Sequence, residues 1–469
     1  MAAAGTCTLT ADQSGNGNYN PAPQQVQSFT IAKAAQSITF AQPGDQTYGT
    51  APFQVTATAT SLLPVTFVAT GSCTVSGTGS PPVSPATVTL TSTGTCTVTA
   101  SQSGNSNFNA APDVARMFAI DLKDFYTLVG SMAQPRSYHT ATGFYSGPLA
   151  GWVLVTGGLD ASGAPTATSE LYNPVTRTFV ATGNLPSKSA GHTATLLANG
   201  KVLAVGGGNS SAEIFDPATK SWSSAGSLSS TRSYLTATVL GDGTNRVFVA
   251  GGVDNGGKTI NSTILYNPSN GTFANGPNLT TARERHTATL LPNGTVLIVG
   301  GRQQSGGSYI TLGSAEICTA TACTALVSSP SARYSHVAVA LPNGTVLLAG
   351  GSNGSTDLAT AEILDPTTGG ITPAGTLQAG RRELTASGLP NGRAVAAGGQ
   401  NGTTPTSASD LYKPPLAAGA PMNAARAGHT ATLLKDAAGN VINVLIVGGV
   451  SGSPAKSVSS AELYGSFGP

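Results

Sequence analysis

The clearest pattern along the chain is an alternation of polar and apolar residues that is followed by a β-branched run. Residues 286–291 read HTATLL, which predicts a strand with one buried face. Residues 295–301 read TVLIVGG, a β-branched run that ends at a diglycine. The Asn-Gly pair between the two segments tolerates the positive φ angles of a tight hairpin turn. Residues 283–301 are therefore predicted to form an antiparallel hairpin.

This hairpin is one copy of a repeat, since its diglycine recurs at spacings of 49, 45, 49, 50, 48 and 50 residues. A segment such as SELYNP at 169 or AEIFDP at 212 follows each diglycine, and an apolar residue stands 13 positions before each histidine position. A period in the forties is typical of an array whose unit is one supersecondary element. Each unit is predicted to contain four short strands. The diglycines are Gly157-Gly158, Gly206-Gly207, Gly251-Gly252, Gly300-Gly301, Gly350-Gly351, Gly398-Gly399 and Gly448-Gly449.

Seven four-stranded units with glycine and aromatic residues at recurring positions indicate a β-propeller. The diglycine, the E-x-Y-x-P segment and the R-x-x-H start of the first strand resemble the kelch-repeat family over residues 122–469. The resemblance implies an all-β chain with a seven-bladed kelch-type propeller.

The two ends of the array predict how its ring closes. The last unit stops at AELYGSFGP and lacks a fourth strand, whereas DFYTLVGSM at 124–132 precedes the first complete unit. We expect Phe125, Tyr126 and Leu128 to supply the outermost strand of the last blade, because this join leaves no unpaired edge within the ring.

A different repeat fills residues 1–121. Residues 5–33 match residues 94–122, and Cys7 is equivalent to Cys96 at a distance of 89 residues. Alternating strands between Gly and Pro signals resemble the bacterial Ig-like repeats, which implies a β-sandwich stalk of about 90 residues at 34–121. Residues 1–33 then correspond to the last strands of an incomplete Ig-like repeat.

Three structures are compatible with residues 1–33, since two strands cannot bury an apolar face alone. The segment stays partly disordered, folds back on the complete unit, or is donated to another copy as added strands. Donation in one direction gives a head-to-tail contact, and such contacts produce filaments when they do not close.

The five cysteines indicate an oxidising compartment. Within the Ig-like unit Cys73 and Cys96 are expected to pair, and Cys318 and Cys323 bracket a turn that a hairpin disulfide could span. Cys7 is left over, either free or paired between chains. The alternative is five reduced thiols.

The composition of the chain limits the classes of partner that it is expected to bind. Charged residues make up only 9% of the chain and the net charge is +2, so no basic patch for nucleic acid is expected. No apolar run approaches the roughly 18 residues that a membrane helix needs, so no membrane insertion is expected. The first residues lack the pattern of a signal peptide, so a signal of a secreted protein would be removed or upstream.

The sequence patterns indicate no catalytic site. All five histidines, His139, His192, His286, His336 and His429, fall on one repeat position, which favours a structural role. The H-E-x-x-H motif of zinc metalloproteases is absent from the sequence. Tyr138-His139 resembles a Tyr–His pair of the galactose-oxidase-like kelch enzymes, which need copper and a Cys–Tyr crosslink. No spare histidine completes that set, so we expect no enzyme, metal or cofactor.

A repeated arginine precedes the first strand of every unit except the second, where Ser189 stands. A repeated acid opens the third strand of every unit except the third, where Ile264 stands. The arginines form either a ligand-binding ring or ion pairs that lock blades together. The offset vacancies predict pairing of each arginine with the acid of the next unit. The arginines are Arg136, Arg232, Arg283, Arg333, Arg381 and Arg426, and the acids are Glu170, Glu213, Glu316, Glu362, Asp410 and Glu462.

Two further features concern the surface. Tyr309, in the longest loop at 301–314, is a candidate ligand contact. Eight N-x-S/T sequons are possible glycosylation sites, at Asn209, Asn261, Asn270, Asn278, Asn293, Asn343, Asn353 and Asn401.

The sequence thus predicts a non-catalytic protein of the bacterial cell surface or exterior that assembles with other copies of itself into a filament. An adhesin whose propeller binds a glycan or protein is the alternative, and a copper oxidase is the third class.

Overall fold

The computed structural model describes residues 3–77, 84–414 and 416–465. Its regular elements are β-strands, apart from one 3-10 turn at Pro390–Gly392. Nowhere in these ranges is there a helix long and apolar enough to cross a membrane. The chain divides into two compact units, Met1–Asp121 and Leu122–Pro469.

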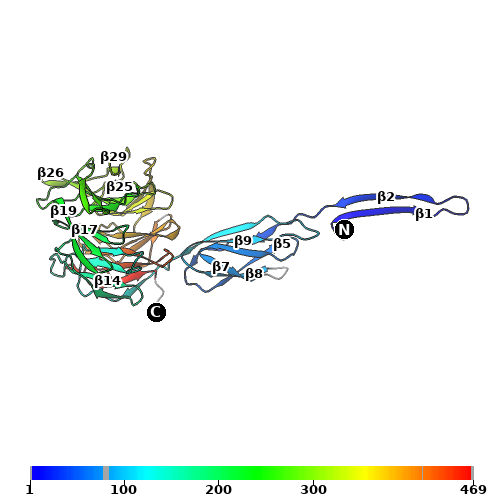
Figure 1. Ribbon diagram of the computed structural model, residues 1–469, viewed down its shortest axis with the longest axis horizontal. Coiled ribbons are helices and arrows are strands. Elements are labelled where there is room, and N and C mark those ends of the chain that lie inside the picture. Colours follow the sequence, from blue (N-terminus) through cyan, green and yellow to red (C-terminus); the bar gives the residue numbers. More distant parts are fainter. Residues whose placement is uncertain (1–2, 78–83, 415, 466–469) are drawn as a thin grey trace. The chain divides into compact units, whose positions relative to one another are not determined.

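The first unit begins with a two-stranded sheet of β1 (Gly5–Gln13) and β2 (Ala22–Ile31), which pair antiparallel with each other. Nearly all of their residues are exposed. This hairpin is the pair of blue strands labelled in Figure 1.

The remainder of the first unit contains two four-stranded sheets that share one apolar core. Phe40 and Phe67 meet edge to face across this core at 5.6 Å, and Phe53 and Phe118 do so at 5.9 Å. One sheet has the order β4 (Gln46–Thr47), β10 (Val114–Asp121), β9 (Gly94–Ser101) and β6 (Thr66–Gly71). The other has the order β3 (Ile38–Phe40), β5 (Phe53–Ala59), β8 (Ser84–Leu90) and β7 (Cys73–Ser76).

Both disulfides expected from the sequence are present. The Cys73–Cys96 disulfide joins β7 of one sheet to β9 of the other, and Cys318–Cys323 closes a hairpin in the second unit. Cys7 is a free, half-buried thiol.

The described part of the second unit contains seven four-stranded sheets. The first three are β12 (Thr140–Gly143), β13 (Val153–Thr156), β14 (Ser169–Asn173) and β15 (Thr178–Ala181); β16 (His192–Leu196), β17 (Val202–Gly206), β18 (Asn209–Asp216) and β19 (Ser221–Arg232); and β20 (Thr236–Val239), β21 (Val247–Ala250), β22 (Thr263–Asn267) and β23 (Thr272–Asn275). The next three are β24 (Thr287–Leu290), β25 (Val296–Val299), β28 (Ala315–Cys318) and β29 (Cys323–Ala325); β30 (Val337–Ala340), β31 (Val346–Ala349), β32 (Thr360–Leu364) and β33 (Ile371–Thr376); and β34 (Thr385–Leu389), β35 (Arg393–Ala397), β38 (Ser409–Tyr412) and β39 (Leu416–Ala418).

The seventh sheet combines the two ends of this unit. Its order is β40 (Thr430–Lys435), β41 (Val441–Val447), β44 (Ala461–Tyr464) and β11 (Tyr126–Val129). Tyr126 lies opposite Tyr464, with the two rings 5.1 Å apart, and the amide of Gly465 donates to the carbonyl of Phe125. Leu128 pairs with Glu462 through its backbone, and its side chain is 58% exposed.

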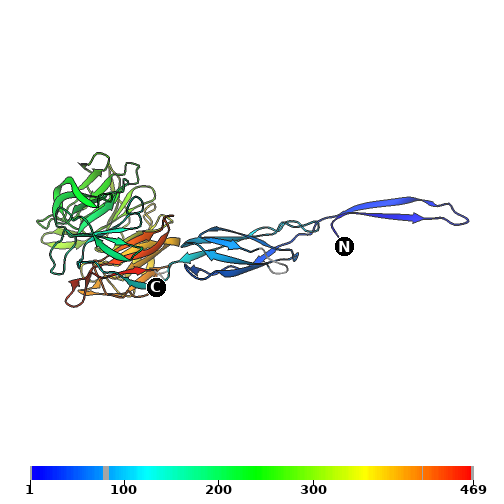
Figure 2. The ribbon, with the colours of Figure 1, turned by 60° about the horizontal axis from the view of Figure 1, so that its bottom comes forward.

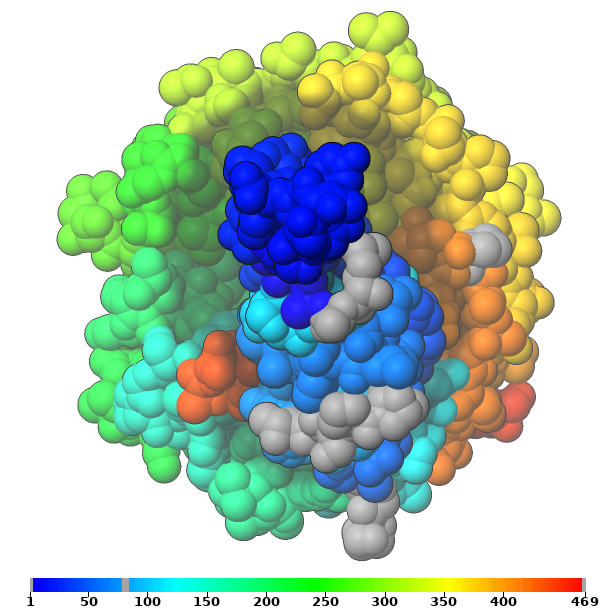
Figure 3. Space-filling model, turned by 90° about the vertical axis from the view of Figure 1, so that its right-hand side faces the viewer, coloured from blue at the N-terminus to red at the C-terminus, as the bar shows by residue number. Residues whose placement is uncertain are grey.

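The first strands of successive sheets contact one another in a circuit, from β12 through β16, β20, β24, β30 and β34 to β40, which contacts β12. The arrangement is a β-propeller-like all-β fold. Figure 2 shows the strands of the second unit as ribbons, and in the space-filling view of Figure 3 the colours of this unit pass from cyan through green and yellow to orange around its rim.

Two sets of contacts join neighbouring sheets. In six sheets the amide of the second diglycine residue donates to the carbonyl at the arginine position of the next sheet, as Gly301 does to Arg333 at 2.8 Å, and in the second sheet Gly208 donates to Arg232 at 3.2 Å. Each repeated histidine shares a hydrogen bond through Nε2 with a threonine hydroxyl of the preceding sheet, as His192 does with Thr140 at 3.0 Å. The sheets are therefore joined through backbone amides and neutral imidazoles.

The repeated arginines do not form a ligand face, because all six are fully buried. The prediction of pairing with the next unit is also wrong. Arg283 bonds Glu316 of its own unit at 2.9 Å because the guanidinium turns back beneath its own diglycine, where Nη1 donates to the carbonyl of Gly300 at 2.6 Å. The other ion pairs of this kind are also within one unit: Arg136–Glu170, Arg333–Glu362, Arg381–Asp410 and Arg426–Glu462.

In the two units that lack the arginine or the acid, the residue that remains forms hydrogen bonds within its own unit. Arg232, in the unit with Ile264, donates to the carbonyl and hydroxyl of Ser262 instead of a carboxylate. Glu213, in the unit with Ser189, accepts from the hydroxyl of Ser211.

Candidate functional site

The residue directly before each repeated histidine position lies on a hydrogen-bonded ring at the centre of the circuit. Each of these residues donates its amide to the carbonyl of its equivalent in the preceding sheet, at 2.9 to 3.2 Å. The last bond runs from Tyr138 to the carbonyl of Gly428, so the ring is complete. Its members are Tyr138, Gly191, Tyr234, Arg285, Ser335, Glu383 and Gly428.

All seven ring residues have left-handed backbone angles, including five that are not glycine. The φ values are 52° for Tyr138, 55° for Tyr234, 53° for Arg285, 50° for Ser335 and 56° for Glu383. A left-handed residue that is not glycine costs on the order of 1–3 kcal/mol and recurs at functional sites. Glycine occupies this position at Gly191 and Gly428, so the fold itself does not require a larger side chain there. The five larger side chains are therefore the candidates for a functional role.

Three of these side chains interact across the ring although they come from three different sheets. The hydroxyl of Tyr138 donates to Oε2 of Glu383 at 2.7 Å, and Nη1 of Arg285 lies 3.1 Å from Oε1 of Glu383. The guanidinium of Arg285 also lies 3.8 Å over the ring of Tyr234. Together with Ser335 they line a cavity of about 240 Å³. We call this cavity the central mouth.

The protonation states in the central mouth follow from its burial and charges. Burial raises the pKa of Tyr138, and the Glu383 carboxylate raises it further, so the hydroxyl remains a donor. Burial alone would lower the pKa of Arg285, but Tyr234 and Glu383 outweigh it and the pKa is raised. The side chains of Arg285 and Glu383 are 17% and 11% exposed, so the pair is partly accessible.

Two further ion pairs each contain one residue that neighbours a ring residue in the sequence. Arg302 Nε lies 2.8 Å from Oε1 of Glu284, and Arg382 Nη1 lies 2.7 Å from Oδ1 of Asp357. With the Arg285–Glu383 pair, three arginines balance three acids. Such a neutral but strongly polar set can form hydrogen bonds with a ligand without attracting a net charge.

Tyr309 lies on a small hairpin of β26 (Arg302–Ser305) and β27 (Ser308–Thr311). Its side chain is 47% exposed, and the guanidinium of Arg302 lies 4.0 Å over its ring. Arg302 also lies 4.9 Å over the ring of Tyr334. The exposed Tyr309 is thereby linked to the charged residues around the central mouth.

The histidines do not offer ligands for a metal. Their Nε2 atoms are bonded to threonine hydroxyls of the preceding sheet, and their Nδ1 atoms are buried. Burial lowers the pKa of all five, to about 4 for His192 and about 3 for His286 and His429. They are therefore neutral structural side chains at pH 7.

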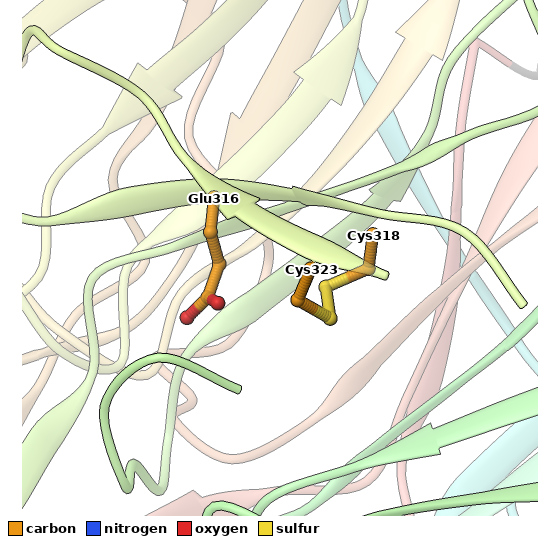
Figure 4. A group of neighbouring side chains, drawn as sticks. All are labelled: Glu316, Cys318 and Cys323. Atoms are coloured by element: carbon orange, nitrogen blue, oxygen red, sulfur yellow. A yellow bond between two sulfur atoms is a disulfide. The ribbon is translucent and has the colours of Figure 1, made fainter. Parts of the chain in front are cut away.

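One group among the described residues has the spacing of metal-binding side chains: Glu316, Cys318 and Cys323 (Figure 4). The two sulfurs are joined as a disulfide, so neither is a thiolate ligand. Glu316 is paired with Arg283. This group does not suit a metal ion.

The asparagines of the sequons differ in accessibility. Seven are exposed, whereas Asn209 is half-buried and its amide donates to Ser189 Oγ at 2.9 Å. Asn293 and Asn343 accept bonds from the residues two positions later in their turns, at 3.1 Å each.

Tyr234, Arg285, Ser335 and Glu383 were not predicted from the sequence as site residues. One feature of the sequence indicates these residues. Within R-x-x-H the position before histidine varies between aromatic, basic, acidic and small residues, whereas its neighbours repeat. Variable positions on a repeated scaffold are where repeat proteins place their binding residues.

Comparisons with known proteins agree with this fold. Residues 333–369 match a Kelch motif. No curated protein sequence matches the chain. The matching solved structures include a fungal alcohol oxidase of the AA5 family in complex with copper, which is 17% identical, with a TM-score of 0.55. The match covers 72% of this chain and 76% of that one, and at this identity it shows the fold alone.

Proposed function

We propose that this protein is a non-catalytic, extracellular structural or interaction protein. In this proposal residues 34–121 form an Ig-like sandwich, and residues 122–469 form a seven-bladed kelch-type propeller that β11 closes as an N-terminal outer strand. The Kelch motif and the seven four-stranded sheets support the propeller. The two disulfides support an oxidising exterior environment.

The observation that carries the proposed assembly is the exposure of the β1–β2 hairpin. Residues along both strands are exposed, including Leu9 at 60% and Phe29 at 51%, and within the described part of the chain each strand pairs with the other alone. An exposed strand edge is a template for pairing with another chain. The hairpin therefore donates its strands to another copy, and repeated donation in one direction gives a filament.

Deletion of residues 1–33 tests this assembly. Electron microscopy of the purified full chain should show fibres, and the deletion variant should remain folded and monomeric. The matched control is Tyr309→Ala, which changes an exposed side chain of the second unit and should leave the fibres intact. Fibres that persist after the deletion would disprove strand donation.

The central mouth favours a second candidate function, that of an adhesin binding a neutral polar ligand such as an uncharged glycan, or a protein segment. A 240 Å³ cavity lies below the range of drug-sized sites, which suits a single sugar or side chain. A glycan and protein binding screen with Glu383→Gln and Tyr138→Phe tests it. Both variants should lose at least tenfold in affinity, whereas Tyr145→Phe, which lines a separate cavity, should not.

A copper oxidase is the remaining alternative, and the side chains argue against it because the histidine nitrogens are bonded or buried. Metal analysis of protein purified after incubation with copper tests this point. Stoichiometric, tightly bound copper would overturn the non-catalytic proposal.

A further inference from the structure

A cavity distinct from the central mouth lies between the first strands of five sheets in the second unit. Its volume is about 460 Å³, within the range of about 300–1,000 Å³ that is usual for small-molecule pockets. Each of these strands contributes an alanine and one or more of the residues that follow it towards the end of the strand. We call this cavity the turn-end cavity. The strands that line it are β12, β16, β30, β34 and β40.

The turn-end cavity lies where three sheets carry a small residue at one repeat position. The small residues are Gly143, Ala340 and Gly388, which all line the cavity. A Cβ at Gly388 would lie 3.3 Å from Cγ1 of Val339, so a larger side chain at this position would extend towards the neighbouring sheet. The cavity is therefore made by particular residues of this chain rather than by the repeat itself. The equivalent residues of the other four sheets are Leu196, Val239, Leu290 and Leu433.

Elsewhere in the repeat, a hydroxyl of one sheet is matched to a carbonyl of the next sheet. Thr142 donates to the carbonyl of Ala194 at 3.3 Å. Thr432 donates to the carbonyl of Ala141 at 3.3 Å. These bonds satisfy carbonyl groups on strand edges that no other strand of the sheet covers.

Beside the turn-end cavity this matching fails in two consecutive sheets. Val339 occupies the threonine position and has no hydroxyl to donate to the carbonyl of Ala386. Ser387 occupies it in the following sheet, and its hydroxyl has no hydrogen-bond partner within the described residues, although Ser387 is only 6% exposed. The carbonyl of Ala431, which is the equivalent acceptor, is also left without a hydroxyl donor in the part of the chain that the structure describes. Buried polar groups of this kind are uncommon in folded proteins and indicate a missing partner.

The chemistry of that partner follows from the rest of the lining. Of the described residues that line the cavity, none is an aspartate, glutamate, histidine, lysine or arginine. An ionised group would lose its hydration there without gaining a counter-charge. The ligand is therefore uncharged, with an acceptor for the serine hydroxyl, a donor for the alanine carbonyl, and a short aliphatic part that packs on Leu196, Leu433 and Val339.

We propose that the turn-end cavity binds an uncharged carboxamide that carries a short aliphatic chain. The carboxamide oxygen accepts from the hydroxyl of Ser387, and the carboxamide N–H donates to the carbonyl of Ala431. The ligand thus bridges the two groups whose equivalents, Thr142 and Ala194, bond directly to each other. This binding site adds to the assembly and adhesion proposed above and depends on neither.

Hexanamide is the probe, titrated into the full chain and followed by ligand-observed NMR. It should bind saturably at one site per chain. Hexanoate, which has the same chain but a charged carboxylate at pH 7, should bind at least tenfold more weakly. This comparison is demanding, because Lys435 Nζ lies 4.9 Å over the ring of Tyr145, a lining residue, and would favour hexanoate if charge decided binding. Absence of saturable hexanamide binding, or equal binding of hexanoate, would overturn the proposal.

Two variants of the lining test the position of the ligand. Gly388→Leu introduces the residue that Leu196 and Leu433 provide at this repeat position, and it should fill the cavity and weaken hexanamide binding at least tenfold. Ser387→Ala removes the hydroxyl donor and should weaken binding about fivefold. Thermal unfolding checks that each variant is folded. If Gly388→Leu does not fold, Ala340→Leu fills the cavity from the neighbouring sheet at an exposed position and decides the question.

Leu290→Ala is the matched control for the filling variants. It changes the same repeat position in a sheet that does not line the turn-end cavity, so the affinity for hexanamide should stay the same. Equal losses in Leu290→Ala and Gly388→Leu, or full affinity in Gly388→Leu, would show that hexanamide binds elsewhere and would reject the site.

Discussion

The five buried histidines couple the stability of the second unit to pH. Burial holds the pKa of His192 at about 4, below the value of about 6.5 expected for the unfolded chain. Protons therefore bind the unfolded state preferentially as the pH falls from 6.5 towards 4. The stabilisation is fully present above pH 6.5 and is lost on acidification, by about 1.4 kcal/mol per histidine for each pH unit in this window.

We therefore expect the thermal midpoint of unfolding to fall between pH 7 and pH 4, and His192→Leu to reduce the pH slope by one histidine's share. Leucine is a suitable replacement because Leu235 and Leu384 occupy this repeat position in two other units. Leu235→Met, which removes no titrating group, is the control. An unchanged slope in His192→Leu would contradict the assignment.

The buried ion pairs predict different losses at matched arginines. In Arg283→Met the carboxylate of Glu316, whose side chain is 0% exposed, loses its cation, and the expected loss is about 3–5 kcal/mol. Replacing both partners, as in Arg283→Met with Glu316→Leu, should recover much of it. Arg232→Met should cost less, because Arg232 bonds Ser262 and leaves no carboxylate behind. Thermal unfolding of the three variants measures these differences, and equal losses at both arginines would refute the pairing argument.

At the scale of strands and turns, the diglycine is the most demanding element. Gly301 has a φ of 92°, and a Cβ there would meet the carbonyl oxygen of Glu284 at 2.6 Å and His286 Cβ at 2.9 Å. Its amide also donates to Arg333 of the next sheet. Gly301→Ala should therefore lower the thermal midpoint by several degrees, because backbone must move. Gly307→Ala, at a φ of 83° in a turn with nothing near its Cβ, isolates the effect of crowding; equal shifts in the two variants would exclude it.

Strand pairing was predictable from the sequence to the extent that it is encoded locally. Alternation, Asn-Gly turns and the diglycine period indicate short strands and their order, because each signal acts within a few residues. The direction of Arg283 was not predictable, since the sequence places acids in both its own and the next unit at suitable intervals. Only the backbone path, which brings the carbonyl of Gly300 within 2.6 Å of Arg283 Nη1, selects Glu316.

The central mouth escaped prediction for a related reason. Tyr138, Arg285 and Glu383 are separated by 98 to 245 residues in their mutual contacts, so no local pattern joins them. Their convergence results from the circuit of sheets, in which equivalent repeat positions meet at the centre. Once the repeat is aligned, the variable position before histidine is the only indication of it.

At the scale of the whole chain, the position of β11 sets where the second unit can begin. The unit starts at Leu122, and β11 at Tyr126–Val129 is the outer strand of the sheet that contains β44 near the other end. The side chain of Tyr126 is 8% exposed and packs on Tyr464, so these few residues cover apolar surface as well as a strand edge.

Deletion up to residue 121 should leave a cooperative thermal transition. Deletion up to residue 130 should lower its midpoint and expose β44 to aggregation, since an uncovered edge pairs with other chains. Addition of a peptide of residues 122–130 should restore part of the lost stability, and Tyr126→Ala in that peptide should abolish the rescue. If the two deletions unfold alike, the strand is an accessory to the seventh sheet rather than the element that completes it.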